Sequence, residues 1–176
     1  GSSWPEDEAL IIQYFNKRPH QKLIIAPHEI DEKHLQQIES RLSRPTIRYS
    51  QATLENIRQA DCLIIDTFGM LSSIYRYGSM AYIGGGFGAG IHNILEAAVY
   101  GIPVVFGPNF KKFREARNML AAGCAFTISQ YQPLEQLMDD LVAHPDKLAA
   151  IGKIAGDYFA LQAGATDIIY KAIYGN

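Results

Sequence analysis

Short apolar runs alternate with segments of helical spacing along most of this chain. The apolar runs occupy residues 23–27, 46–50, 62–66, 80–85, 104–108 and 125–129. Most of them are apolar throughout, which is typical of parallel strands covered on both faces. Helical patterns begin near Ser3 and fill 31–43, 51–60, 69–78, 91–101, 111–123, 133–144 and 145–174. The alternation predicts an α/β fold: one Rossmann-like domain with a parallel six-stranded sheet.

The ends of the chain carry two further expectations. At the start, Ser3 is suited to cap a helix, with Pro5 in the first turn and Glu6 at the capping-box position. At the other end, 145–174 reads as one or two helices, with a break near Gly164. The apolar residues of the last stretch either cover this domain's own sheet or stay partly exposed; they are Tyr158, Phe159, Ile168, Ile169 and Tyr170.

Composition fits one globular domain over 1–176. The chain has 48% hydrophobic and 19% charged residues, and its net charge of -2 gives no reason to expect nucleic acid as a partner. Cys62 and Cys124 lie in apolar runs, so we expect buried thiols instead of a disulfide or a metal site. No apolar run approaches the roughly 20 residues of a membrane helix. The acidic start is unlike a signal peptide, and without an initiator Met the chain is expected to be a soluble fragment.

Unusual residues follow four of the predicted strands. His28 and Glu29 follow one strand, Asp66 and Thr67 another, a glycine cluster a third, and Pro108-Asn109 a fourth. Ligands of open parallel sheets gather at the carboxyl ends of strands. We therefore expect these four strand ends to form one rim.

The glycine cluster is the strongest chemical signal. Five glycines occur between Gly84 and Gly90, ahead of a predicted helix. Glycines let backbone N–H groups approach an anion, although they can also relieve crowding in a tight strand-to-helix connection. Gly84, Gly86 and Ala89 also fit the dinucleotide pattern G-x-G-x-x-A. We disfavour NAD, because several strands precede the loop and the next strand ends without the acid that would hold a ribose.

Asn93 and Glu96 lie three positions apart, on one face of the predicted helix. Glu96 could accept hydrogen bonds from a ribose diol or could be a solvated residue at the helix start. Asn93 could donate to a phosphate or cap the helix. His92 is interpreted as structural rather than catalytic.

Four segments together resemble the C-terminal half of the Kdo (3-deoxy-D-manno-octulosonate) transferases, which have the GT-B glycosyltransferase fold. DTFGML at 66–71, followed by Tyr75, is similar to the family's D-T-x-G-E-L…Y. Residues 84–96 resemble G-G-S…G-G-H-N-x-L-E, and 101–115 resemble G-x-P-V-x-F-G-P…N-F-R-E. Residues 1–6 are similar to G-S-T-x-x-G-E.

The resemblance implies a binding site for the donor CMP-Kdo. The family transfers Kdo to a lipid A precursor, with inversion and without a metal or other cofactor. By analogy, Glu96 would hold the ribose, Asn93 and the 86–90 amides the phosphate, and the 68–71 turn the cytosine. The implied donor-binding residues are Ser2, Ser3, His28, Phe68, Gly69, Met70, Leu71, Gly86, Phe87, Gly88, Gly90, Asn93 and Glu96.

Two departures from the family pattern bear on this site. Met70 stands where the family commonly has Glu, and Pro27-His28-Glu29-Ile30 stands where it has Pro-Arg-His-Pro. His28, Lys111 or Lys112 could replace the positive charge of the missing Arg. Alternatively, His28 is a polar strand-end residue and the lysines begin a solvated helix.

The resemblance also implies what this chain lacks. The general base, the lipid A precursor site and the membrane contact would lie in an absent N-terminal half, at the cytoplasmic face of the bacterial inner membrane. The chain alone would bind nucleotide weakly and transfer no sugar. The alternatives are the donor-binding half of a UDP-sugar transferase or epimerase, an NAD-binding domain, and an interaction domain with a structural glycine loop.

Overall fold

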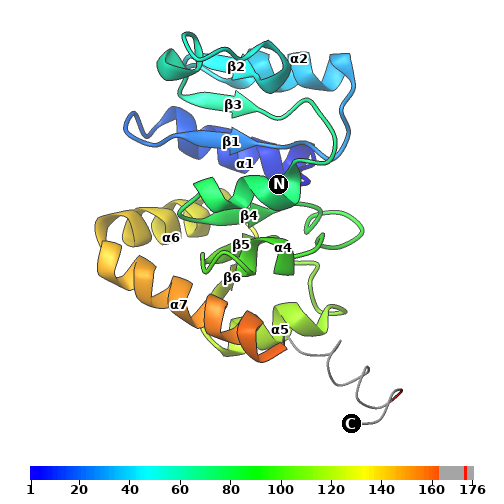
Figure 1. The fold of residues 1–176 in the computed structure, drawn as a ribbon, viewed down its shortest axis with the longest axis vertical. Helices are drawn as coiled ribbons and strands as arrows, with labels where there is room; N and C mark the ends of the chain where they lie inside the picture. The colour runs from blue at the N-terminus through cyan, green and yellow to red at the C-terminus, as the bar shows by residue number, and fades with distance from the viewer. Residues whose placement is uncertain (163–172, 174–176) are drawn as a thin grey trace.

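The structure, a computed structural model, describes residues 1–162 and 173 (Figure 1). All six predicted strands are present but short. They are β1 (Leu23–Ile25), β2 (Thr46–Arg48), β3 (Cys62–Ile64), β4 (Ala81–Ile83), β5 (Val104–Phe106) and β6 (Ala125–Thr127). The helices are α1 (Pro5–Asn16), α2 (Glu32–Arg41), α3 (Leu71–Ile74), α4 (Leu95–Ala98), α5 (Arg114–Ala121), α6 (Tyr131–Ala143) and α7 (Pro145–Gln162). In the described part of the chain, three 3₁₀ turns follow β2 or α3: η1 (Tyr49–Gln51), η2 (Ile57–Gln59) and η3 (Tyr75–Tyr77).

The predicted six-stranded sheet is wrong in one respect: the strands form two parallel three-stranded sheets. Their orders are β1-β3-β2 and β4-β5-β6. The two sheets meet at β1 and β4, which do not pair with each other (Figure 1). The α/β class and the parallel strand direction are confirmed.

Residues 1–3 run between the two sheets and bond to both. Gly84 N–H donates to the Gly1 carbonyl at 2.9 Å, on the β4 side. On the β1 side, Ser3 N–H donates to Ala26 O at 3.2 Å and His28 N–H donates to Ser3 O at 2.9 Å. This segment therefore connects the two sheets where a direct β1–β4 ladder is missing.

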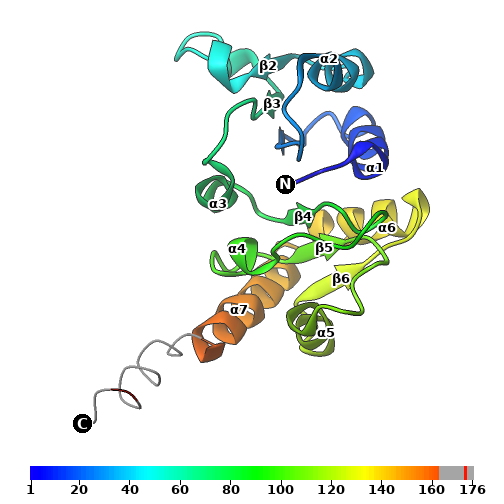
Figure 2. The same ribbon diagram turned by 90° about the vertical axis from the view of Figure 1, so that its right-hand side faces the viewer.

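Each sheet has its own apolar core. The larger core lies on the face of β5 that carries Val104 and Phe106, and it includes Met119; all three are fully buried. The smaller core joins α1 and α2 to β1 and β3, through residues such as Phe15 and Ile38. Figure 2 shows α1 on one side of the sheets and α3 on the other. Cys62 and Cys124 are buried free thiols, as predicted.

The cap residue of the first helix lies one position later than the predicted Ser3. Trp4 holds the cap position, and its backbone N–H donates to the side chain of Asp7 at 3.0 Å. Ser3 instead points its hydroxyl at Glu8, 3.0 Å away. The capping acid is thus Asp7 and not Glu6, which is exposed.

The helix predicted over 51–60 is wrong, because this stretch forms only η1, a turn and η2. Thr53 and Asn56 exchange side-chain-to-backbone hydrogen bonds of 2.7 and 3.2 Å, which compete with helical pairing. Leu54 is 87% exposed, so the stretch offers no apolar face for a core to hold.

The last described helix is α7, in which Tyr158 packs partly against the larger core. The predicted break near Gly164 and residues Ile168, Ile169 and Tyr170 lie outside the described residues. Within the described part of the chain, no helix is both long and apolar enough to cross a membrane.

Candidate functional site

Three segments meet at the carboxyl ends of β1 and β4: residues 1–4, the turn at His28, and the glycine loop. At Gly84 the approach is so close that a Cβ atom would collide with the backbone of Ser2 and Ser3. A residue with a side chain would push the segments apart, so glycine is required at this position. Of the four strand ends predicted to form one rim, those of β1 and β4 meet here, and Asn109 after β5 bonds to the same glycine loop.

An aromatic stack of Trp4, His28 and His92 lies on this rim. The Trp4 and His28 ring centres are 4.7 Å apart, and those of His28 and His92 are 4.4 Å apart. Trp4 Nε1–H donates to His92 Nε2 at 3.2 Å. Burial and the neighbouring His28 lower the pKa of His92, which keeps this imidazole neutral as the acceptor that Trp4 requires.

Asp7 connects the start of α1 to the glycine loop. Its side chain is fully buried and accepts three hydrogen bonds. The donors are Trp4 N–H at 3.0 Å, Gly85 N–H at 2.9 Å and Tyr82 OH at 2.9 Å. The carboxylate therefore fixes the loop against α1, and it uses one of the loop's own N–H donors.

A second buried carboxylate, Glu8, anchors the N-terminal segment through Ser3. It accepts from Ser3 Oγ at 3.0 Å and pairs with His34 Nε2 at 2.8 Å, while His34 Nδ1 faces Glu29 O at 3.1 Å. Burial opposes the charge on His34, but Glu8 and the Glu29 carbonyl outweigh it and raise the pKa of His34. Ser3 is thus 1% exposed and faces Glu8 instead of the rim.

The glycine loop closes on itself. Gly88 N–H and Gly90 N–H both donate to Gly85 O, at 3.1 and 3.2 Å. The backbone hydrogen bonds of the described residues leave three loop donors without an acceptor, the N–H groups of Gly86, Phe87 and Ala89. Because Gly86 is buried, the N–H groups of Phe87 and Ala89 are the loop donors that an anion could approach.

The segment after β5 wraps the loop. Asn109 Nδ2 donates to Gly88 O and Lys112 Nζ donates to Ala89 O, both at 2.8 Å. The Phe87 side chain packs into the apolar cluster around Val105, so only its backbone is available to a ligand. Lys111 is exposed on the same segment. Lys112 therefore brings a positive charge directly to the glycine loop.

Asn93 and Glu96 are neighbours in space, as predicted. Asn93 Nδ2 donates to Glu96 Oε1 at 3.2 Å, and Asn93 Oδ1 caps Leu95 N–H at 3.1 Å. The predicted long helix over 91–101 is wrong, because α4 is a single turn. Burial, with the charge of Glu96 adding to it, raises the pKa of Tyr75. Glu96 therefore faces the α3–η3 side of the rim.

The 68–71 turn lies beyond Tyr75 on that side. Phe68 is 82% exposed, and Gly69 is exposed beside it. Met70 accepts from Thr67 Oγ1 at 3.2 Å through its sulfur, and Leu71 packs close to Gly1. The preceding strand-end residue, Asp66, instead accepts a hydrogen bond from the N–H of Ser50, which follows the neighbouring strand β2.

Asp7 and Trp4 carry no local signal in the sequence that marks them as site residues, and His92, predicted to be structural, packs against His28 and Trp4. Their partners lie far away along the chain: Trp4 and His92 are 88 positions apart, and Asp7 and Gly85 are 78 apart. Local pattern carries no information on such pairs. Among the residues the structure describes, no cluster of three or more His, Cys, Asp or Glu could hold a metal ion.

No protein-family model matches the chain. Curated relatives do match it. The 3-deoxy-D-manno-octulosonic acid transferase of Chlamydophila psittaci is 28% identical over 155 residues, which cover 85% of this chain and 35% of the relative. The enzyme of the same name from Bordetella pertussis is 33% identical over 108 residues, which cover 60% of this chain and 25% of the relative. The resemblance to the Kdo transferases is confirmed. The matched part of the chain spans a quarter to about a third of the length of these curated Kdo transferases.

Solved structures show the same fold. The C-terminal CMP-Kdo binding domain of WaaA from Acinetobacter baumannii matches with a TM-score of 0.76 and 21% identity, over 89% of this chain and 84% of that one. WaaG, a glycosyltransferase involved in lipopolysaccharide biosynthesis, matches with a TM-score of 0.50 and 11% identity, over 99% of this chain and 52% of WaaG. This chain therefore has the fold of that C-terminal domain of WaaA.

Proposed function

We propose that this chain is the CMP-Kdo-binding part of a Kdo transferase of lipopolysaccharide biosynthesis. The observation that carries the proposal is the convergence, on one rim, of the free Phe87 and Ala89 amides, the His28–His92 pair and Glu96. The similarity to curated Kdo transferases and to the WaaA domain supports this choice of donor.

The parts of the rim suit the parts of a cytidine monophosphate. The N–H groups of Phe87 and Ala89 face the phosphate, with Lys112 supplying positive charge beside the loop. Asn93, which bonds Glu96, adds a side-chain donor. Glu96 accepts from the ribose diol, and the backbone at 68–71 contacts the base. Ser2 and His28 face the Kdo group of the donor, which carries an anionic carboxylate. Ser3 positions this segment through its hydrogen bond to Glu8.

Such a site would assist transfer by stabilising the leaving group. As the bond from the Kdo anomeric carbon to the phosphate oxygen breaks, negative charge grows on the CMP phosphate. Preoriented amides and Lys112 lower the free energy of that charge without a metal ion. Deprotonation of an acceptor hydroxyl needs a base, which we place in the part of the longer protein outside this chain. The lipid A precursor and the inner-membrane contact are assigned to that part too.

A nucleotide titration tests the proposal. With labelled protein, CMP should shift the amide resonances of Phe87, Ala89 and the 68–71 turn, while UMP should shift them more weakly and NAD not at all. Shifts by UMP equal to those by CMP would favour another nucleotide-sugar enzyme. Shifts by NAD alone would end the proposal. The chain by itself should release no CMP from CMP-Kdo in the presence of acceptor.

A further inference from the structure

The imidazole of His92 is held by two other rings in two different ways. Trp4 Nε1–H donates to His92 Nε2 at 3.2 Å, so the indole and the imidazole meet at their edges. His28 stacks on both of these rings, with interplanar angles of 28° to Trp4 and 26° to His92. An edge contact and a face contact therefore fix the orientation of His92 together.

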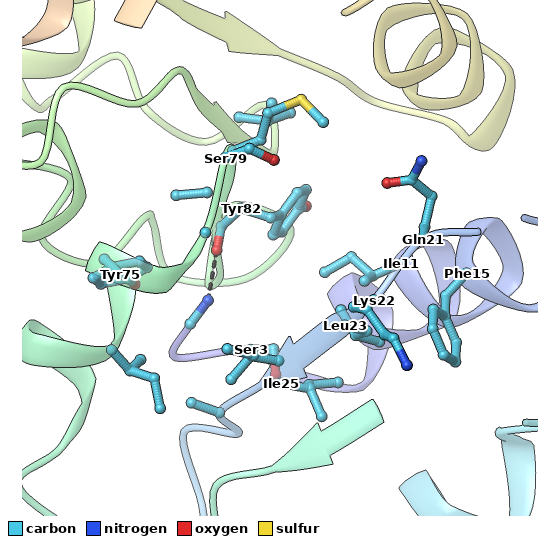
Figure 3. Close-up of a pocket in the computed structure, with 18 of the residues that line it drawn as sticks. Ser3, Ile11, Phe15, Gln21, Lys22, Leu23, Ile25, Tyr75, Ser79 and Tyr82 are labelled. Atoms are coloured by element: carbon cyan, nitrogen blue, oxygen red, sulfur yellow. Dashed lines mark hydrogen bonds between the residues drawn. The ribbon is translucent and has the colours of Figure 1, made fainter. Parts of the chain in front are cut away.

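The backbone that carries Trp4 is anchored to both sheets. Figure 3 shows Ser3 beside β1 and Tyr82 on β4, on opposite sides of the groove between these strands. Ser3 N–H bonds to the backbone that follows β1, at 3.2 Å. Asp7 accepts from Trp4 N–H at 3.0 Å and from Tyr82 OH at 2.9 Å. The indole is therefore positioned relative to the loop after β4 by the fold itself.

The hydrogen bond from Trp4 determines which nitrogen of His92 carries the proton. An indole N–H can only donate, so Nε2 must be the unprotonated, accepting nitrogen. Burial lowers the pKa of His92, and the neighbouring His28 adds to this effect, so the ring is neutral near neutral pH. A neutral imidazole has one N–H, which therefore lies on Nδ1. Free imidazole side chains in water prefer the opposite tautomer, with the proton on Nε2.

The protonated nitrogen lies on the open side of the ring. A Cβ added at Gly85 would lie 3.0 Å from His92 Cδ2 and 3.2 Å from Nε2, so that edge packs against the loop backbone. Nδ1 lies across the ring from this edge and has no hydrogen-bond partner among the described residues. Because no buried side-chain nitrogen or oxygen of the described residues lacks a partner, Nδ1 is accessible to solvent. Its N–H is therefore free to donate to a ligand.

We propose that Trp4 is a positioning residue, which holds His92 in the Nδ1–H tautomer so that this N–H donates to the phosphate of the bound nucleotide. The inference rests on the proposed function, because it needs a phosphate at the glycine loop. His92 directly follows this loop, and its backbone N–H donates to Gly84 O at 3.1 Å, so its side chain starts close to the free Phe87 and Ala89 amides. The opposite tautomer would turn a lone pair toward the phosphate and repel it.

The tautomer is measurable without any nucleotide. In protein with ¹⁵N-labelled histidine, proton–nitrogen correlation spectra distinguish the two ring nitrogens, and the H92N variant identifies the His92 signals. Wild type should show the Nδ1–H form. W4F keeps an aromatic ring against His28 but removes the indole N–H, so it should shift His92 toward the Nε2–H form. The matched control is H28A, which removes the stacked ring and keeps the hydrogen bond, so His92 should stay in the Nδ1–H form.

Three spectroscopic results would overturn the proposal. They are an Nε2–H form in wild type, an unchanged tautomer in W4F, and a shift in H28A as large as that in W4F. Thermal unfolding checks that each variant is folded. If W4F does not fold, β-(3-benzothienyl)alanine at position 4 replaces it, because this isostere keeps the shape of the indole and lacks the N–H.

Nucleotide binding tests the phosphate contact. W4F should bind CMP about tenfold more weakly than wild type, because one hydrogen bond to a charged group is lost, and it should bind cytidine as wild type does. The amide of Asn reaches the position of Nδ1 and that of Gln the position of Nε2, so H92N should bind CMP more tightly than H92Q. An equal loss of CMP and cytidine affinity in W4F would make the role of Trp4 merely structural and overturn the proposal.

The two measurements separate this inference from the proposed function. If wild type binds no CMP, the proposed function fails and the phosphate contact fails with it. If CMP shifts the Phe87 and Ala89 amides of wild type but W4F keeps both its tautomer and its CMP affinity, only the role of Trp4 fails.

Discussion

The buried carboxylate of Asp7 accepts a hydrogen bond from the backbone N–H of Gly85, 2.9 Å away. This bond ties the first turn of α1 to the glycine loop after β4. Because Asp7 also holds Trp4 N–H and Tyr82 OH, a single side chain positions three segments of the proposed donor site. The loop is therefore preorganised by α1 and not by its glycines alone.

Replacing Asp7 should destabilise the fold. D7A removes the acceptor of three donors, and we expect it to lower the free energy of unfolding by about 3 kcal/mol or more, since each buried unpaired group costs about 1–3 kcal/mol. The matched control is E6A, which removes an exposed acid one position earlier and should change stability by less than about 0.5 kcal/mol. Urea denaturation compares the two, and equal effects would mean that Asp7 has no anchoring role.

Replacing Gly85 or Gly88 of the loop with alanine should have different effects. Gly85 has a φ of 89°, and a Cβ there would lie 2.5 Å from Gly90 O. G85A should therefore destabilise the protein by about 2 kcal/mol or more and weaken CMP binding. At Gly88 the nearest atom to a Cβ is 3.9 Å away, so G88A should keep the wild-type stability. Thermal unfolding and CMP titration of both variants test this difference. A G85A protein with wild-type stability and CMP affinity would contradict the loop geometry.

Substituting Glu96 should show whether its side chain binds the ribose. If it accepts from the ribose diol, E96Q weakens CMP binding about 10- to 100-fold, because hydrogen bonds to a charged group contribute about 1.5–3 kcal/mol. The same substitution should matter less for 2′-deoxy-CMP, which lacks one of the two hydroxyls. Calorimetric titration of wild type and E96Q with both nucleotides gives the coupling free energy between Glu96 and the 2′-hydroxyl. An equal loss for the two nucleotides would show that Glu96 acts elsewhere.

The His34–Glu8 pair should make stability depend on pH. The folded-state pKa of His34 is raised above its ordinary value of about 6.5, so the folded protein holds this proton more tightly than the unfolded chain does. The resulting stabilisation is fully present below about pH 6.5 and is lost as the pH rises through the folded-state pKa. The stability difference between wild type and H34Q should therefore shrink from pH 5.5 to pH 8.5. Denaturant titrations that find a constant difference would contradict this assignment.

Local pattern predicted much of this molecule, for identifiable reasons. Apolar runs located all six strands, and the i, i+3 spacing brought Asn93 next to Glu96. The 51–60 helix failed because Thr53 and Asn56 bond to each other's backbone. Strand composition could not reveal that β1 and β4 stay apart, since pairing depends on what lies between them. Trp4 next to His92 is likewise a tertiary contact, with no local signal in the sequence.

The most direct test of the donor-site proposal is a crystal structure of this chain grown with excess CMP. The proposal predicts the phosphate within hydrogen-bonding distance of the Phe87 and Ala89 amides, with the ribose hydroxyls on Glu96. A nucleotide bound at another place, or a glycine loop left empty at saturating CMP, would contradict it.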